Sequence, residues 1–136
     1  MKVIFVCTGN TCRSPMAEYI LKSMDPKVEV SSAGIRANPG EPISSHAQNV
    51  IFRELSCLVD HRARALTRDE MADADLILTM TSTQRDYLRA MGNYPVFSLK
   101  EYAGETGDVA DPIGGDYGEY LDTFFQLKRL IGKLKI

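Results

Sequence analysis

The sequence has few cysteines, almost no net charge and no long apolar run. Three cysteines among 136 residues, an odd number, argue against a disulfide framework and for a reducing compartment, the cytoplasm. Sixteen basic residues against 18 acidic ones give a net charge of −2, so the basic excess of a nucleic-acid-binding protein is absent. No apolar stretch approaches the length of a membrane span, and the N-terminus lacks the three-part pattern of a signal peptide. We therefore expect a cytoplasmic protein whose partners are neither nucleic acids nor membranes.

The alternation of apolar and amphipathic segments predicts the fold class. A length of 136 residues suits one domain, and we take residues 1–136 as that domain. The expected strands are residues 2–7, 28–32, 75–80 and 96–99, and the expected helices are residues 14–24, 44–55, a short one after Thr67, 81–91 and one from about Tyr117 on. Strands separated by helices predict a doubly wound α/β fold, in which helices cover both faces of a parallel sheet. Ligands bind such a fold at the carboxyl ends of its strands, where Cys7 lies.

The first expected strand leads into a loop that combines a nucleophile with anion-binding groups. Residues 7–14 have the sequence Cys-Thr-Gly-Asn-Thr-Cys-Arg-Ser, and Ser14 and Pro15 suit the N-cap and first position of the next helix. Backbone N–H groups and the helix dipole at such a junction attract an oxyanion. The same field favours a thiolate at Cys7, and Arg13 can reach back to bind the same anion with two donors. The loop therefore predicts a phosphate site with its own nucleophile.

The residue types in the loop make this interpretation more specific than their spacing does. A cysteine and an arginine six residues apart occur often by chance, and fit a buried thiol and a surface cation. Gly9 and Asn10, however, tolerate left-handed backbone angles, which a loop needs to turn successive N–H groups inward. We expect the whole loop to bind phosphate: Thr8, Gly9, Asn10, Thr11, Cys12, Arg13 and Ser14.

Three aspartates between the last strand and the last helix are candidates for a general acid. A thiolate that attacks phosphorus expels a leaving group that needs a proton. Pro112 stiffens the loop next to Asp111, and apolar neighbours on both sides can desolvate that carboxyl group. Asp108 and Asp116 suit solvated loop positions. The residues alone favour Asp111 modestly.

Taken together, the motifs resemble those of the low-molecular-weight protein tyrosine phosphatase family over essentially the whole chain. The matching segments, in family order, are residues 6–18, 32–34, 61–64, 74–80 and the pair Asp111-Pro112. The resemblance implies a four-stranded sheet in the order 2-1-3-4 and hydrolysis of phosphorylated proteins through a cysteinyl-phosphate. It makes Cys7 the nucleophile, Arg13 the residue that holds the phosphoryl oxygens, and Asp111 the general acid. Backbone amides and Arg13 take the place of a metal, so we expect no cofactor and no metal, and we favour a monomer.

The resemblance also implies supporting roles for four polar residues. Asn10, Ser14, Ser32 and His61 match positions that hold the loop in its strained shape and donate hydrogen bonds toward the thiolate. Without the resemblance, His61 fits an ordinary polar residue near a turn, and Ser32 fits a hydroxyl group at the end of a strand.

Cys12 has two interpretations. It fits a small buried side chain below the loop, and it also fits a resolving thiol that forms a reversible disulfide with oxidised Cys7. The resemblance supports the second interpretation. Cys57 has no partner in the sequence, and we expect it to be structural.

The chain departs from the tyrosine-directed pattern where an aryl phosphate needs flat apolar walls. Thr8, Thr11 and Ile113 stand where those members carry apolar or aromatic residues, and the rim loop, residues 35–40, holds no aromatic residue. Thr11 resembles the bacterial protein arginine phosphatases, a branch of the same family, and its short hydroxyl side chain leaves room for a flat phosphoguanidinium group. We therefore expect phosphoarginine as the substrate, with Thr11 and Ile113 setting specificity and phosphotyrosine as the alternative.

Two functions of other classes share parts of this pattern. An arsenate reductase of this type relays oxidation through two further cysteines, and only Cys57 follows Cys12. A phosphocarrier needs an acceptor protein and has no use for an acid at Asp111. Both functions explain fewer of the residues than a phosphatase does.

Overall fold

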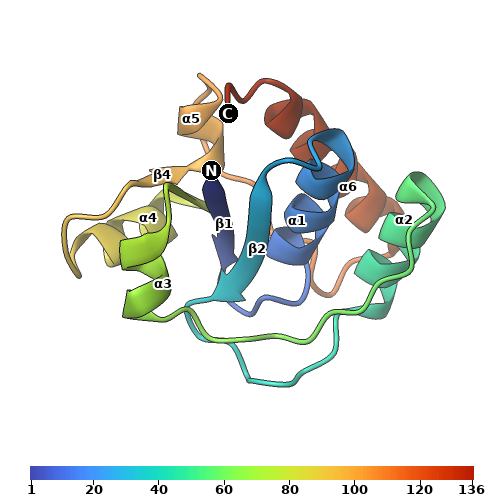
Figure 1. Ribbon diagram of the computed structural model, residues 1–136. Coiled ribbons are helices and arrows are strands. Elements are labelled where there is room, and N and C mark those ends of the chain that lie inside the picture. The colour runs from blue at the N-terminus through green and yellow to red at the C-terminus, as the bar shows by residue number, and fades with distance from the viewer.

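In the computed structural model, which describes residues 1–136, a parallel β-sheet lies between two groups of helices (Figure 1). The strands are β1 (Lys2–Cys7), β2 (Glu29–Gly34), β3 (Leu76–Thr79) and β4 (Val96–Ser98), and the helices are α1 (Arg13–Met24), α2 (Ser45–Leu55), α3 (Arg68–Asp73), α4 (Ser82–Arg89), α5 (Leu99–Tyr102) and α6 (Tyr117–Gly132). The sheet order is β2-β1-β3-β4, and every neighbouring pair is parallel. The prediction of a doubly wound α/β fold with strand order 2-1-3-4 is confirmed.

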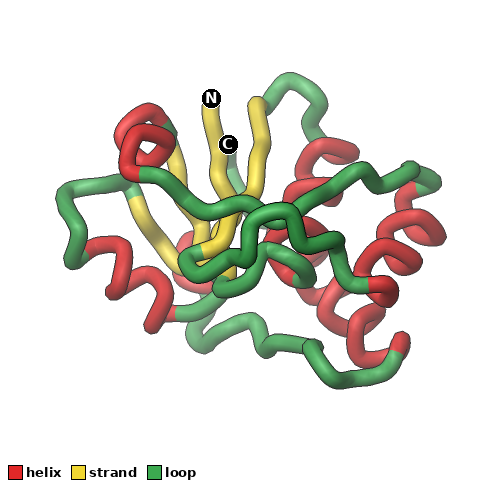
Figure 2. The backbone as a smooth tube through the Cα atoms, turned by 90° about the horizontal axis from the view of Figure 1, so that it is seen from below, coloured by secondary structure: helices red, strands yellow, loops and turns green.

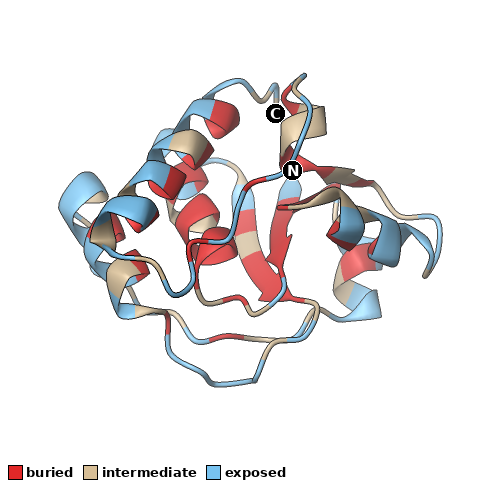
Figure 3. Ribbon diagram, turned by 180° about the vertical axis from the view of Figure 1, so that it is seen from behind, coloured by how far each residue is buried: buried red, intermediate tan, exposed pale blue.

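Alternate residues of the central strand β1 face two separate cores. Val3 and Phe5 belong to the larger core, to which α1, α2 and α6 contribute, whereas Ile4 and Val6 belong to the smaller core beside α3 and α4. Because successive side chains of a strand point to opposite faces, this alternation requires helices on both sides of the sheet. Figure 2 shows the strands between the two groups of helices, and Figure 3 shows buried residues concentrated in the sheet and on the inner sides of the helices.

Local signals set most of the helix starts. Thr67 and Thr81 form capping boxes with Glu70 and Gln84, at the beginning of α3 and α4 respectively, as the sequence predicts for Thr67. The short helix α5, which Ser98 caps, was not predicted, because four residues are too few to produce a helical period.

The start of α1 corrects one prediction. This helix begins at Arg13 with Cys12 as its N-cap, so the prediction of Ser14 as N-cap and Pro15 as first helical residue was wrong. The Ser14 hydroxyl group is instead bound to the sulfur of Cys7 and the side-chain amide of Asn10. No side chain caps the helix, which leaves its first N–H groups available to an anion.

The loops that hold the expected site residues gather at the carboxyl ends of the strands, which face the viewer in Figure 2. Cys7, the last residue of β1, is paired in register with Gly34, the last residue of β2. A Cβ atom on Gly34 would lie 2.7 Å from the carbonyl oxygen of Thr8, so only glycine lets the loop after β1 pass this closely. No helix combines the length and the apolar character that crossing a membrane requires.

Candidate active site

The Cys7 sulfur lies in a small pocket formed mainly by the loop after β1. The pocket has a volume of about 40 Å³ and is lined by Cys7, Gly9, Asn10, Thr11, Cys12, Arg13, Asp111 and Ile113. Two donors meet the buried sulfur, the Ser14 hydroxyl group at 2.9 Å and the backbone N–H of Asn10 at 3.3 Å. The side-chain amide of Asn10 donates to the Ser14 oxygen at 2.9 Å, which leaves the hydroxyl proton for the sulfur. Two donors aimed at one sulfur atom stabilise a thiolate.

Asn10 fixes the shape of this loop. It is fully buried and adopts the left-handed conformation, with φ of 57°, that its residue type tolerates. Its side-chain nitrogen donates to Ser14 and, at 3.0 Å, to the hydroxyl group of Ser32. Its side-chain oxygen accepts from the N–H of Arg64 at 3.0 Å, and its carbonyl oxygen accepts from Nε2 of His61 at 2.8 Å. The structure therefore brings the four expected supporting residues into one network under the loop.

Glu18 extends the network, and its role was not predicted from the sequence. Its Oε1 accepts from the Ser32 hydroxyl group at 2.6 Å, which leaves the Ser32 oxygen to accept from Asn10. The signal that could have identified it is its place on α1, because Glu18 follows Ser14 by four residues and shares its face of the helix.

Arg13 connects the phosphate loop to the loop that carries Asp111. Its buried guanidinium group donates through Nη1 to the carbonyl oxygen of Val109 at 2.8 Å, and Nη2 lies 3.4 Å from Oδ2 of Asp111. The other carboxylate oxygen of Asp111 accepts from the N–H of Ile113 at 3.1 Å. The Asp111 side chain is 42% exposed, so its carboxyl group borders both the pocket and the solvent.

The three candidate aspartates occupy different environments. Only Asp111 lines the pocket. Asp108 accepts from the N–H of Ser82 at 2.8 Å, at the start of α4, and Asp116 is the N-cap of α6, where it accepts from the N–H of Glu119 at 3.0 Å. Asp111 is thus the one aspartate of the three that shares a pocket with Cys7.

The three residues that depart from the tyrosine-directed pattern also differ in position. Thr11 is half-buried and lines the pocket, and Ile113 lines it while remaining 67% exposed. Thr8 does not line the pocket, because its exposed hydroxyl group is turned to α4, where it accepts from the side-chain amide of Gln84 at 3.1 Å. Thr11 therefore lines the pocket and Thr8 does not, and the Thr11 hydroxyl oxygen lies 3.8 Å from the sulfur of Cys12.

Cys12 contacts α6 through Tyr120. The sulfur lies 3.5 Å from the tyrosine hydroxyl oxygen. Burial, reinforced by the hydrogen bond with Cys12, raises the pKa of Tyr120 to about 12, so the hydroxyl group keeps its proton and can donate it to the sulfur. All three cysteines are free thiols, and Cys57 lies half-buried in the segment after α2. Cys12 shares the pocket with Cys7.

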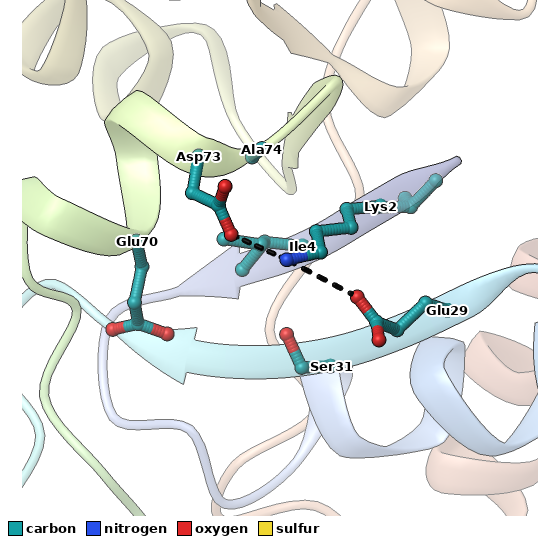
Figure 4. A pocket seen from close by; sticks show the side chains of 8 residues that line it. Lys2, Ile4, Glu29, Ser31, Glu70, Asp73 and Ala74 are labelled. Carbon is teal, nitrogen blue, oxygen red and sulfur yellow. Dashed lines mark hydrogen bonds and ion pairs between the residues drawn. The ribbon is translucent and has the colours of Figure 1, made fainter.

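Another surface hollow, of about 160 Å³, lies near the other end of β1, between β2 and α3 (Figure 4). Lys2 pairs there with Asp73 at 2.5 Å and with Glu29 at 3.6 Å, and the hydrogen bond to Asp73 is the main reason that the pKa of Lys2 is raised. No cysteine and no anion-binding loop lines this hollow. No group of three or more His, Cys, Asp or Glu side chains is arranged to hold a metal ion.

Comparison with known proteins places this geometry in a family. The family described as low molecular weight phosphotyrosine protein phosphatase matches residues 2–135. The chain is 41% identical over 137 residues to the low molecular weight protein-tyrosine-phosphatase PtpB of Staphylococcus epidermidis, covering 99% of this chain and 97% of that protein. It is 42% identical over 142 residues to the protein-arginine-phosphatase of Bacillus subtilis, covering 98% and 94%. A solved structure of YwlE arginine phosphatase, a C7S mutant with a phosphorylated active-site serine, matches with a TM-score of 0.93 and 41% identity, covering 98% of this chain and 92% of that chain.

The chain therefore belongs to the low molecular weight phosphotyrosine protein phosphatase family, as its motifs predict, and is a protein phosphatase. Relatives of nearly equal identity are named for phosphotyrosine and for phosphoarginine. Family membership thus establishes hydrolysis of phosphorylated proteins and leaves the phosphorylated residue open.

Proposed function

We propose that the protein hydrolyses phosphoarginine in proteins through a covalent cysteinyl-phosphate. The observation that carries the proposal is the small pocket that Cys7 lines together with Arg13, Asp111 and Thr11. In this proposal Cys7 is the nucleophile, Arg13 holds the phosphoryl oxygens and Asp111 is the general acid. The backbone N–H groups of residues 8–14 complete the cradle for the phosphoryl group.

In the first step the Cys7 thiolate attacks phosphorus, and the bond between phosphorus and the leaving group breaks. Charge in the transition state lies on the peripheral phosphoryl oxygens, where the N-terminal N–H groups of α1 and the Arg13 guanidinium group stabilise it. One arm of this guanidinium group is held by Val109, which aims the remaining donors. Asp111, in its acid form, gives its proton to the departing guanidino nitrogen.

In the second step a water molecule releases the phosphoryl group. The Asp111 carboxylate takes a proton from the water, whose oxygen attacks phosphorus. The sulfur–phosphorus bond breaks, inorganic phosphate leaves, and the Cys7 thiolate is regenerated with Ser14 and Asn10 as its donors. The YwlE relative with a phosphorylated serine in its active site supports a phosphoryl group bound to the chain at this position.

The polar wall of the pocket favours phosphoarginine. A phosphoguanidinium group presents N–H donors, and two residues with acceptor oxygens, Thr11 and Asp111, line the pocket. The acid form of Asp111 still accepts through its carbonyl oxygen. A phenyl ring would instead need flat apolar walls, and the rim loop of residues 35–40 supplies no aromatic side chain. Phosphotyrosine is the second candidate, because the exposed Ile113 at the pocket offers one apolar contact to a ring.

The test is the value of kcat/KM on two peptides of one sequence, carrying either phosphoarginine or phosphotyrosine. The wild type should prefer phosphoarginine. Thr11→Ile, which replaces a polar contact by an apolar wall, should weaken phosphoarginine hydrolysis by about ten- to a hundredfold and improve phosphotyrosine hydrolysis. Thr11→Ser keeps the hydroxyl group and is the matched control, expected near the wild type. A wild-type preference for phosphotyrosine would establish the tyrosine-directed function instead, and an unchanged ratio in Thr11→Ile would contradict the role of Thr11 in specificity.

We further propose that residues 1–136 act as one phosphatase domain in the cytoplasm. Its three free thiols, two of them in the pocket, support a reducing compartment. Cell fractionation with an antibody against the chain tests the location, and recovery in an oxidising compartment would contradict it.

A further inference from the structure

The loop that carries Asp111 is tethered at two points to the junction between β3 and α4. Asp108 accepts through Oδ1 a hydrogen bond of 2.8 Å from the N–H of Ser82, the first helical residue of α4. One residue further on, the N–H of Val109 donates to the carbonyl oxygen of Met80 at 2.9 Å. Both tethers lie within three residues of the Asp111 carboxyl group.

The Asp108 tether is separate from the cap that α4 makes for itself. Thr81 and Gln84 form the capping box at this N-terminus, in which Thr81 Oγ1 accepts from the N–H of Gln84 and the Gln84 side chain accepts from the N–H of Thr81. The N–H of Ser82 is satisfied from outside the helix, by an anionic side chain that the helix dipole favours there. The contact therefore fixes a loop to a rigid element.

The same junction also holds the phosphate loop. Oε1 of Gln84 accepts from the N–H groups of Met80 at 3.0 Å and Thr81 at 3.2 Å. Because both of these groups are donors, the amide can only be oriented with its nitrogen toward Thr8, to which it donates at 3.1 Å. Residues 80–84 thus contact both the loop that carries Cys7 and the loop that carries Asp111. These contacts fix the position of one loop relative to the other.

We propose that Asp108 is a positioning residue for the general acid, which holds the loop on α4 so that the Asp111 carboxyl group meets the leaving group. This assignment rests on the proposed role of Asp111. Without Asp108, the Val109 backbone and the Arg13 pair still keep the loop near the pocket. Proton transfer should then slow because Asp111 samples more orientations, whereas phosphate binding by residues 7–14 should change little.

The experiment compares kcat/KM for phenyl phosphate, whose leaving group needs a proton, with kcat/KM for p-nitrophenyl phosphate, whose leaving group does not. This parameter covers only the steps up to loss of the leaving group, so it excludes the second step, in which Asp111 is the base for both substrates. In Asp108→Ala the ratio of the second kcat/KM to the first should rise about three- to tenfold, the factor that one lost hydrogen bond supplies, with the inhibition constant of inorganic phosphate little changed. Asp108→Asn keeps the acceptor oxygen and should restore most of the wild-type ratio. The control is Asp116→Ala, which also removes a hydrogen bond between an aspartate and a helix N-terminus, here that of α6. This variant should keep the wild-type ratio.

The double variant Asp108→Ala/Asp111→Asn distinguishes the failure of this inference from that of the proposed function. If Asp108 acts through Asp111, the double variant should be no slower on phenyl phosphate than Asp111→Asn alone. An additive loss, an equal loss on both substrates in Asp108→Ala, or the same ratio change in Asp116→Ala would overturn the positioning role. If Asp111→Asn slows phenyl phosphate no more than it slows p-nitrophenyl phosphate, the general-acid role of Asp111 and the positioning role of Asp108 are both overturned.

Discussion

Replacing Asn10 with alanine tests whether the network under the phosphate loop holds the site together. The Asn10 side chain is fully buried and makes three hydrogen bonds, two donated to Ser14 and Ser32 and one accepted from Arg64. Each such bond contributes about 0.5–1.5 kcal/mol, and the left-handed backbone adds about 1–2 kcal/mol for alanine. We expect Asn10→Ala to lower the free energy of unfolding by about 2.5–6.5 kcal/mol, a large share of the stability of a typical domain.

Asn10→Gly separates the side-chain contribution from the backbone contribution. Glycine adopts φ of 57° at little steric cost, so this variant should lose the hydrogen bonds but remain about 1 kcal/mol more stable than the alanine variant. In both variants the Ser14 hydroxyl group loses the amide that directs its proton to the Cys7 sulfur, so kcat should fall even where the protein is fully folded.

Urea denaturation followed by circular dichroism measures the stability change, and p-nitrophenyl phosphate turnover well below the midpoint measures the catalytic change. A loss of less than about 1 kcal/mol in Asn10→Ala would contradict the role of this network, because three buried hydrogen bonds of ordinary strength contribute more than that. Equal stability of the alanine and glycine variants would contradict only the cost assigned to alanine in the left-handed backbone conformation, and not the contribution of the hydrogen bonds.

Three further predictions concern the nucleophile, the second thiol and acid stability. Cys7→Ser should abolish turnover but keep the wild-type melting temperature and phosphate binding, because a hydroxyl group is not ionised at neutral pH; substantial remaining activity would contradict the mechanism. Peroxide should inactivate the wild type reversibly and Cys12→Ser irreversibly, and equal recovery with a dithiol would leave Cys12 with a packing role only. Glu105, whose pKa Arg129 and Lys133 lower to about 2, contributes stability that is present above about pH 4.5 and is lost as the pH falls toward 2. The melting temperature of Glu105→Gln should therefore lie below that of the wild type near neutral pH and equal it near pH 2. Equal melting temperatures of the two proteins at both pH values would contradict the ion pairs of Glu105 with Arg129 and Lys133.

Local sequence patterns were sufficient to predict the sheet and the loop that follows β1. The short apolar run before Cys7 is typical of a strand buried on both faces, and Gly9 and Asn10 are residue types that suit the turn that follows it. The strand order came from the family resemblance, because periodicity along a chain does not specify which strands are neighbours. The start of α1 was misplaced, since Ser14 is a good N-cap by residue type but is bound within the site.

Contacts between distant segments were not predictable from the sequence. Gln84 meets Thr8 across 76 residues, and Asp108 meets Ser82 across 26. Such pairs depend on where loops pass one another once the strands have paired, and neither hydrophobic period nor turn chemistry carries that information. For the same reason the residues alone favoured Asp111 only modestly over Asp108 and Asp116, which bind helix N-termini, and the assignment of Asp111 came from the family resemblance.

The proposed function requires that Cys7 carries the phosphoryl group of phosphoarginine during turnover. The most direct measurement mixes the enzyme with a phosphoarginine peptide, quenches the reaction within the first turnover, and locates the bound phosphoryl group by peptide mass spectrometry. Asp111→Ala should accumulate more of this intermediate with a substrate whose leaving group needs no proton, because water is then not activated for the second step. We expect phosphorylation of the Cys7 sulfur in the wild type and none in Cys7→Ala. A phosphoryl group on another residue, or turnover of phosphoarginine in Cys7→Ala, would contradict it.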